Sequence, residues 1–259
     1  MNVFRFSHRA APVALLAGAL LGLTTAASAK TVVQIGGIAT PPITQFTTQP
    51  HGLTLTVDTF FTNDVPDTLP GTIQKAVVYF PHGSRVNAAL FPSCSPAKLQ
   101  RLHGASRACP RGSRLGGGFA LGTAEGFESV TARLKVDVYN GPGGRSLLFY
   151  IFATNPITIA GMINASFQHI NSRRWEYKLT LNVPKGLQEI GPEIFAAVRR
   201  FSVKVGATTT VREGGRTVRR SFIEALACPP GALVPVRGVF SFRAEPQVTQ
   251  DGYIACGKR

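Results

Sequence analysis

The chain has 259 residues, a formal net charge of +15, and charged side chains at only 16% of positions. The abundance of Gly, Pro, Thr and Val is typical of many β-strands joined by tight turns. No apolar stretch reaches the about 20 residues that a membrane-spanning helix needs, so the sequence predicts no transmembrane span in the mature chain.

The first 29 residues have the pattern of a secretory signal peptide. Arg5 and Arg9 form a basic start, and the apolar segment 10–23 follows with 14 residues. An A-x-A motif ends at Ala29, which predicts cleavage between Ala29 and Lys30. A short anchor helix that stays attached is the alternative, but the apolar segment is too short to span a bilayer.

The mature chain, 30–259, has room for a single β domain. Loss of Arg5 and Arg9 leaves it with a net charge of +13. An exported basic protein is a poor candidate for binding nucleic acid, so we expect anionic cell-wall polymer or lipid headgroups as partners. Codon usage in a GC-rich genome, together with a charge that favours solubility, is the alternative explanation.

Alternation with a period of two predicts half-buried strands. The clearest cases are 53–57, 133–138 and 176–183. Two further runs, 76–80 and 147–152, are apolar throughout, which indicates strands covered on both faces. The predicted fold is therefore all-β. It is an antiparallel β-sandwich with one short helix that a disulfide holds in place.

That helix is expected just after residue 95. Ser95 can cap it, Pro96 suits its first position, and Gly104 ends it. A second short helix is expected over 189–198, although Gly191 and Pro192 interrupt the pattern.

Four cysteines lie in the mature chain, namely Cys94, Cys109, Cys228 and Cys256. An even number in an exported chain predicts two disulfides. Three pairings are open, and we favour the sequence-local one, Cys94 with Cys109 and Cys228 with Cys256. No C-x-x-C pair is present, so the sequence gives zinc no support.

A hairpin is predicted over 201–223, with the turn at Gly214 and Gly215 and Val211 opposite Val218. Arg212 and Arg216 lie near its tip and are our candidates for contacting a polyanion together. A solvated hairpin tip is the simpler interpretation. A final strand is expected over 236–244.

One arrangement of motifs is specific. A strand ends in Pro-x-Gly at 77–83, Asn87 and Cys94 follow, and then come Cys-Pro-x-x-Ser-x-x-Gly at 109–116 and VDVYNGP at 136–142. This order resembles that of uncharacterised exported β-rich proteins of high-GC Gram-positive bacteria, over about residues 50 to 186. The resemblance implies an exported β fold and carries no activity, cofactor or site residue.

Three groups of residues could carry chemistry. Ser95 and Lys98 match the S-x-x-K nucleophile motif, but a helix cap with a solvated lysine is the better interpretation. Glu125 and Glu128 could form a glycosidase carboxylate pair, but solvated loop residues are favoured. Segment 63–67 reads as a turn rather than a calcium loop. The histidines, at positions 51, 82, 103 and 169, show no metal-binding spacing.

The sequence thus predicts a secreted or envelope-associated, non-catalytic β protein that uses no cofactor and binds anionic cell-surface polymers through a basic face. An extracytoplasmic hydrolase with a site built from distant residues is one alternative. A structural subunit that assembles through edge strands is another, and the oligomeric state is open.

Overall fold

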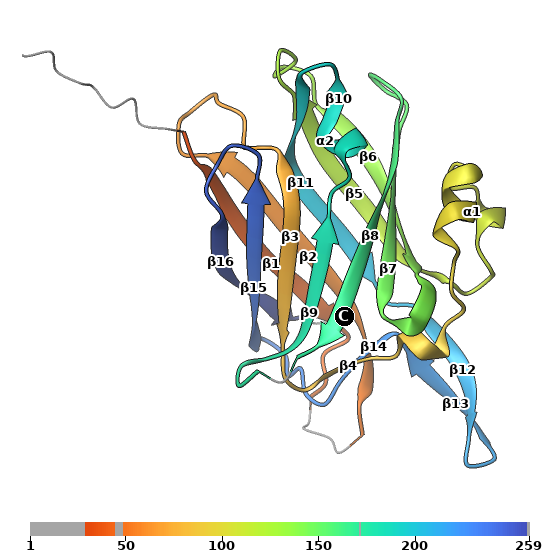
Figure 1. Ribbon diagram of the computed structural model, residues 1–259. Helices are drawn as coiled ribbons and strands as arrows, with labels where there is room; N and C mark the ends of the chain where they lie inside the picture. Colours follow the sequence, from red (N-terminus) through yellow and green to blue (C-terminus); the bar gives the residue numbers. More distant parts are fainter. Residues whose placement is uncertain (1–28, 45–48, 171, 258–259) are drawn as a thin grey trace, which may run out of the picture.

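The computed structural model describes residues 29–44, 49–170 and 172–257. The predicted signal peptide lies outside these residues except for Ala29. The dominant feature is a sheet of eleven strands that closes on itself as a barrel (Figure 1). Neighbouring strands run antiparallel except β1 and β16, which pair in parallel and join the two ends of the described chain.

The barrel strands follow one another in the order β11, β5, β6, β7, β8, β9, β3, β15, β16, β1 and β2, and β2 pairs with β11 to close the ring. Their bounds are β1 Thr31–Thr40, β2 His51–Asn63, β3 Ile73–Pro81, β5 Arg114–Ala124, β6 Ala132–Asn140, β7 Ser146–Ala153, β8 Ile159–His169, β9 Trp175–Asn182, β11 Ile194–Val205, β15 Leu233–Phe242 and β16 Val248–Cys256.

The predicted sandwich is therefore wrong, although the all-β class is confirmed. The alternation of apolar residues identifies which face of a strand is buried, and this pattern is the same in a sandwich and in a barrel. Closure depends on β2 meeting β11, with Leu55 opposite Val205. On the other side of β11, β5 approaches closely: a Cβ at Gly116 or Gly118 would lie 1.9 Å from a backbone oxygen of β11, so only glycine permits this approach.

One end of the barrel, at the bottom of Figure 1, is plugged. Two short strands, β4 (Ser84–Val86) and β14 (Ile223–Ala225), pair with each other there, and β14 also pairs with β2. Phe222 is 2% exposed and packs edge-on against Phe91. The Cys228–Cys256 disulfide ties this segment to the end of β16. We call this the closed end.

The described residues contain two short α-helices, of which one is the disulfide-pinned helix predicted from sequence. The expected helix is α1 (Pro96–Arg101), where the Lys98 backbone N–H donates to Ser95 Oγ at 3.4 Å. The Cys94–Cys109 disulfide encloses it, so both disulfides have the favoured pairing. This segment packs on the outer face of β7, against Leu148 and Tyr150. A disulfide-bound helical loop, not a second sheet, therefore covers the outer face of the apolar run 147–152 at Leu148 and Tyr150, while Phe152 stays 37% exposed.

The second predicted helix, over 189–198, is wrong. The chain there forms α2 (Lys185–Gln188), then the short strand β10 (Glu189–Gly191), then the start of β11. Glu193 has a positive φ of 59° in the turn between the two strands. The Gly-Pro pair thus ends a strand and begins a tight turn. Three single-turn 3-10 helices complete the description: η1 Ala88–Leu90, η2 Ser106–Ala108 and η3 Pro142–Gly144.

The predicted hairpin is confirmed, but it is shorter than 201–223: it is a two-stranded ribbon that extends from the closed end, formed by β12 (Thr208–Glu213) and β13 (Arg216–Ser221), while 201–205 belong to β11. Val211 lies opposite Val218, and both turn glycines have positive φ. The strand expected over 236–244 is β15, but it is not the last, because β16 follows it. Among the described residues, no helix combines the length and apolar character needed to cross a membrane.

Candidate functional site

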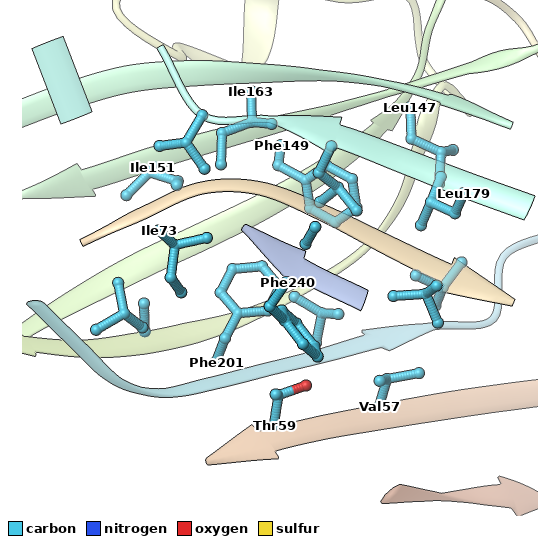
Figure 2. Close-up of a pocket in the computed structure, with 18 of the residues that line it drawn as sticks. Val57, Thr59, Ile73, Leu147, Phe149, Ile151, Ile163, Leu179, Phe201 and Phe240 are labelled. Atoms are coloured by element: carbon cyan, nitrogen blue, oxygen red, sulfur yellow. The ribbon is translucent and has the colours of Figure 1, made fainter. Parts of the chain in front are cut away.

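The barrel encloses an apolar cavity of about 750 Å³. Figure 2 shows side chains from different strands pointing into it, among them Val57 of β2, Phe149 of β7, Leu179 of β9 and Phe201 of β11. A barrel of about eight strands has an interior that its own side chains fill or that holds one small ligand. Eleven strands make a wider barrel, so the inward side chains leave central space even though many are large.

The burial pattern of the inward residues reflects this space. Leu55, Val57, Leu179 and Phe201 point inward yet are only half-buried, because part of each side chain faces the cavity. Other apolar residues of the interior, such as Val136 and Val203, are buried. The interior therefore has a packed outer layer of apolar side chains around an open centre.

Few polar groups face this volume. Thr59 presents its hydroxyl to the cavity (Figure 2), and Thr123 Oγ donates to the Phe127 carbonyl oxygen at 2.8 Å. Of the described lining residues, only His82 and Tyr177 have free ionisable side chains. His82 Nε2 lies 2.7 Å from the Ser172 carbonyl oxygen, and burial followed by the nearby Glu176 charge raises the pKa of Tyr177. The cavity thus suits an apolar molecule better than a reacting polar one.

The end opposite the plug, at the top of Figure 1, is bordered by exposed apolar side chains. Phe127 and Val130, in the loop between β5 and β6, are 55% and 38% exposed, and Ile157, in the loop between β7 and β8, is 44% exposed. All three also line the cavity. We call these three residues the rim and this end the mouth.

Charge is divided between the two ends. The mouth loops (64–72, 125–131, 154–158, 183–193 and 243–247) contain seven of the thirteen acidic residues and two cations. The acids are Asp64, Asp67, Glu125, Glu128, Glu189, Glu193 and Glu245, and the cations are Lys185 and Arg243.

The loops of the closed end (82–113, 141–145, 170–174 and 206–232) have the opposite balance, with twelve cations and two acids. The cations are Arg85, Lys98, Arg101, Arg107, Arg111, Arg145, Arg173, Arg174, Arg212, Arg216, Arg219 and Arg220. Both acids, Glu213 and Glu224, form ion pairs with Arg220. The basic charge of the chain is therefore concentrated at the end away from the mouth.

Acids on the outer wall are paired. Asp137 accepts from Arg114 Nη2 at 2.6 Å and lies 2.8 Å from Lys135 Nζ. Burial raises the pKa of Asp137, but hydrogen bonds from Lys135 and Arg114 and their charges outweigh burial and lower it. Asp251 is paired with Arg237, whose hydrogen bonds lower the Asp251 pKa. These carboxylates are occupied in structural pairs.

The two predicted polyanion contacts lie on opposite faces of the ribbon. Arg212 is opposite Thr217 and Arg216 is opposite Glu213, so the two arginines belong to different alternating sets. Arg219 lies on the same face as Arg212, diagonally across the ribbon, and donates to Thr208 Oγ at 3.0 Å. Contact of Arg212 and Arg216 with a polyanion stays a prediction, and Arg219 rather than Arg216 is the arginine that shares a face with Arg212.

The remaining candidates are dispersed. Ser95 caps α1 outside the barrel. Glu125 and Glu128 lie on an exposed mouth loop, where Glu128 Oε1 accepts from the Gly126 N–H. Asn63 Oδ1 accepts from the Val65 N–H, as expected for a turn at 63–67. Within the described part of the chain, no three His, Cys, Asp or Glu side chains cluster as a metal site.

No known family, no curated protein and no solved structure matches this chain.

Proposed function

We propose that this protein binds an apolar or long-chain lipid-like molecule inside its barrel. The observation that carries the proposal is the apolar cavity of about 750 Å³, plugged at one end and open at a rim of apolar side chains at the other. Its size falls within the roughly 300 to 1,000 Å³ of small-molecule sites, and such sites are mostly apolar with a few polar groups. The cavity is poorly suited to ordered water, because a buried water molecule needs several polar partners.

Fluorescence titration with diphenylhexatriene, an apolar probe that is bright only outside water, tests this proposal. Val57→Trp places an indole in the cavity, and we expect it to weaken probe binding by about tenfold or more, equal to about 1.4 kcal/mol. Phe60→Trp is the matched control on the same strand, since Phe60 points outward beneath the Arg200 guanidinium. No saturable probe binding by the wild type, or equal binding by both variants, would exclude the barrel as a ligand site.

We propose that the protein binds this ligand outside the cytoplasm. Two disulfides are typical of proteins that fold in an oxidising compartment. The Lys30 backbone nitrogen lies 2.7 Å from Asp64 Oδ1, so cleavage before Lys30 would place the new α-ammonium beside a carboxylate. N-terminal sequencing of the exported protein should begin at Lys30. The resemblance to exported proteins of high-GC Gram-positive bacteria predicts the same location.

A second activity, binding of an anionic cell-wall polymer, is supported by the charge of the closed end. Arginines lie on both faces of the projecting ribbon, and Lys98 and Arg101 lie on α1. We expect Arg212→Gln with Arg219→Gln to weaken binding to long-chain polyphosphate. The slope of the logarithm of the binding constant against the logarithm of the salt concentration should become shallower by about one per arginine removed. The control, Lys75→Gln with Lys185→Gln, removes the same charge near the mouth. Equal loss in both variants would indicate general electrostatic attraction rather than a site.

A further inference from the structure

From the position and chemistry of the rim, we infer that the mouth docks onto a lipid bilayer with an uncharged surface and takes its ligand directly from it. The inference rests on the proposed function, because it concerns how an apolar ligand reaches the barrel. The partner we assign to the rim is a zwitterionic lipid bilayer.

The first step of the argument is continuity between rim and cavity. Phe127 and Ile157 are more than two-fifths exposed and also line the cavity, so each side chain contacts both solvent and interior. They belong to two separate loops, between β5 and β6 and between β7 and β8, which lie at the same end. A bilayer that covers these loops would remove the apolar rim from water and give an apolar molecule a path without an aqueous step.

The second step concerns the charge around the rim. The mouth loops have five more acids than cations, and the side chain and α-ammonium of Lys30, which precedes β1 at this end, reduce the excess to three in the mature protein. Anionic headgroups would be repelled there, whereas the cations of the closed end would attract them. An anionic bilayer should therefore bind the protein through the closed end and leave the mouth facing away. A zwitterionic bilayer adds no such repulsion, and the apolar rim then sets the orientation.

The third step is that the rim has a matched counterpart elsewhere. Ile38 on β1 and Tyr253 on β16 are 50% and 58% exposed, close to the exposures of Ile157 and Phe127. They point outward from the wall and do not line the cavity. If general surface hydrophobicity drove membrane contact, this pair would matter as much as the rim.

The experiment measures transfer of diphenylhexatriene from phosphatidylcholine vesicles to the full mature protein. We expect Phe127→Ser with Ile157→Ser to slow transfer by about tenfold or more, since each buried side chain contributes substantially to an apolar contact. The loss of transfer should exceed the loss of affinity measured with free probe in vesicle-free solution. The control, Ile38→Ser with Tyr253→Ser, should transfer at the wild-type rate.

A second arm replaces part of the phosphatidylcholine with phosphatidylglycerol. We expect the wild type to bind these vesicles more tightly yet take up probe more slowly, because the closed end then faces the bilayer. Equal transfer by the rim and control variants, or faster uptake from anionic vesicles, would overturn the inference. Failure of the wild type to bind free probe in solution would instead refute the proposed function, so the two failures are distinguishable.

Discussion

The two ends of the barrel differ in disulfide bonding, charge and exposure. The closed end is held by a disulfide and by buried aromatic residues such as Phe222, and its loops are basic. The mouth has exposed apolar side chains, acidic loops and neither of the two disulfides. On the proposed function, this contrast assigns maintenance of the fold to one end and exchange of the ligand to the other. Changes at the closed end should lower stability, and they should weaken binding only where the changed residue also lines the cavity, whereas changes at the mouth should alter binding with little loss of stability.

The largest expected effect is loss of the Cys228–Cys256 disulfide, which closes a loop with a sequence separation of 28. Replacing both cysteines with alanine should cost about 4 kcal/mol of unfolding free energy in the chain-entropy description. For a chain of this size the melting temperature should fall by roughly 8 to 16 °C. Thermal unfolding followed by circular dichroism measures it.

The control is Cys94→Ala with Cys109→Ala, which opens a loop with a separation of 15 outside the barrel and should cost about 3 kcal/mol. Probe binding should persist in this control and weaken in the Cys228 variant, because Cys228 lines the cavity. The same binding loss in both variants would contradict the distinction between barrel and helical loop.

The next effect is stabilisation by ligand. A molecule that binds only the folded barrel, present at 100 times its dissociation constant, should raise the unfolding free energy by about 2.7 kcal/mol. Differential scanning calorimetry with and without diphenylhexatriene measures the shift. Val57→Trp should show a much smaller shift at the same concentration, whereas Phe60→Trp should respond like the wild type. A shift of equal size in all three proteins would place the probe outside the barrel.

The smallest effect is expected when a carboxylate that is ion-paired on the barrel wall is compared with one that lies on an exposed mouth loop. Asp137→Asn should cost about 1 to 2 kcal/mol at neutral pH, because Arg114 and Lys135 lose their partner. Glu125→Gln should change stability by less than about 0.5 kcal/mol, since Glu125 lies exposed on a mouth loop. Urea unfolding at several pH values measures both.

The pH dependence follows from the lowered pKa of Asp137. Its stabilisation is fully present above the ordinary carboxyl pKa of about 4 and is lost as the pH falls through the lower folded-state value. The difference between wild type and Asp137→Asn should therefore vanish at strongly acidic pH. A difference that grows on acidification would contradict the ion-pair assignment.

The strands and their inward faces were predictable from sequence, because alternation has a period of two whether a sheet is flat, stacked or closed. Leu134, Val136 and Val138 point inward as expected. Closure was not predictable, since it depends on β2 meeting β11 far along the chain. The glycines at 116 and 118 were the available sign of a close strand approach.

The cavity was also hidden from sequence, because an inward Val57 or Leu179 has the same pattern in a packed core and in a hollow one. The mouth left a weaker signal. Phe127 and Ile157 are large apolar residues that follow a turn residue, Gly126 and Pro156 respectively, in loops that are otherwise polar except for Val130. Apolar side chains in such loops can indicate a binding rim, but only the barrel geometry brings these two to one opening.

Native mass spectrometry of the protein purified from its own host without detergent tests the central claim most directly. We predict a mass above that of the mature chain with two disulfides, with the excess released on unfolding and recovered as an apolar molecule in organic solvent. Val57→Trp should carry less of it than Phe60→Trp. A wild-type mass equal to that of the bare chain, together with no saturable uptake of apolar probes, would contradict the account.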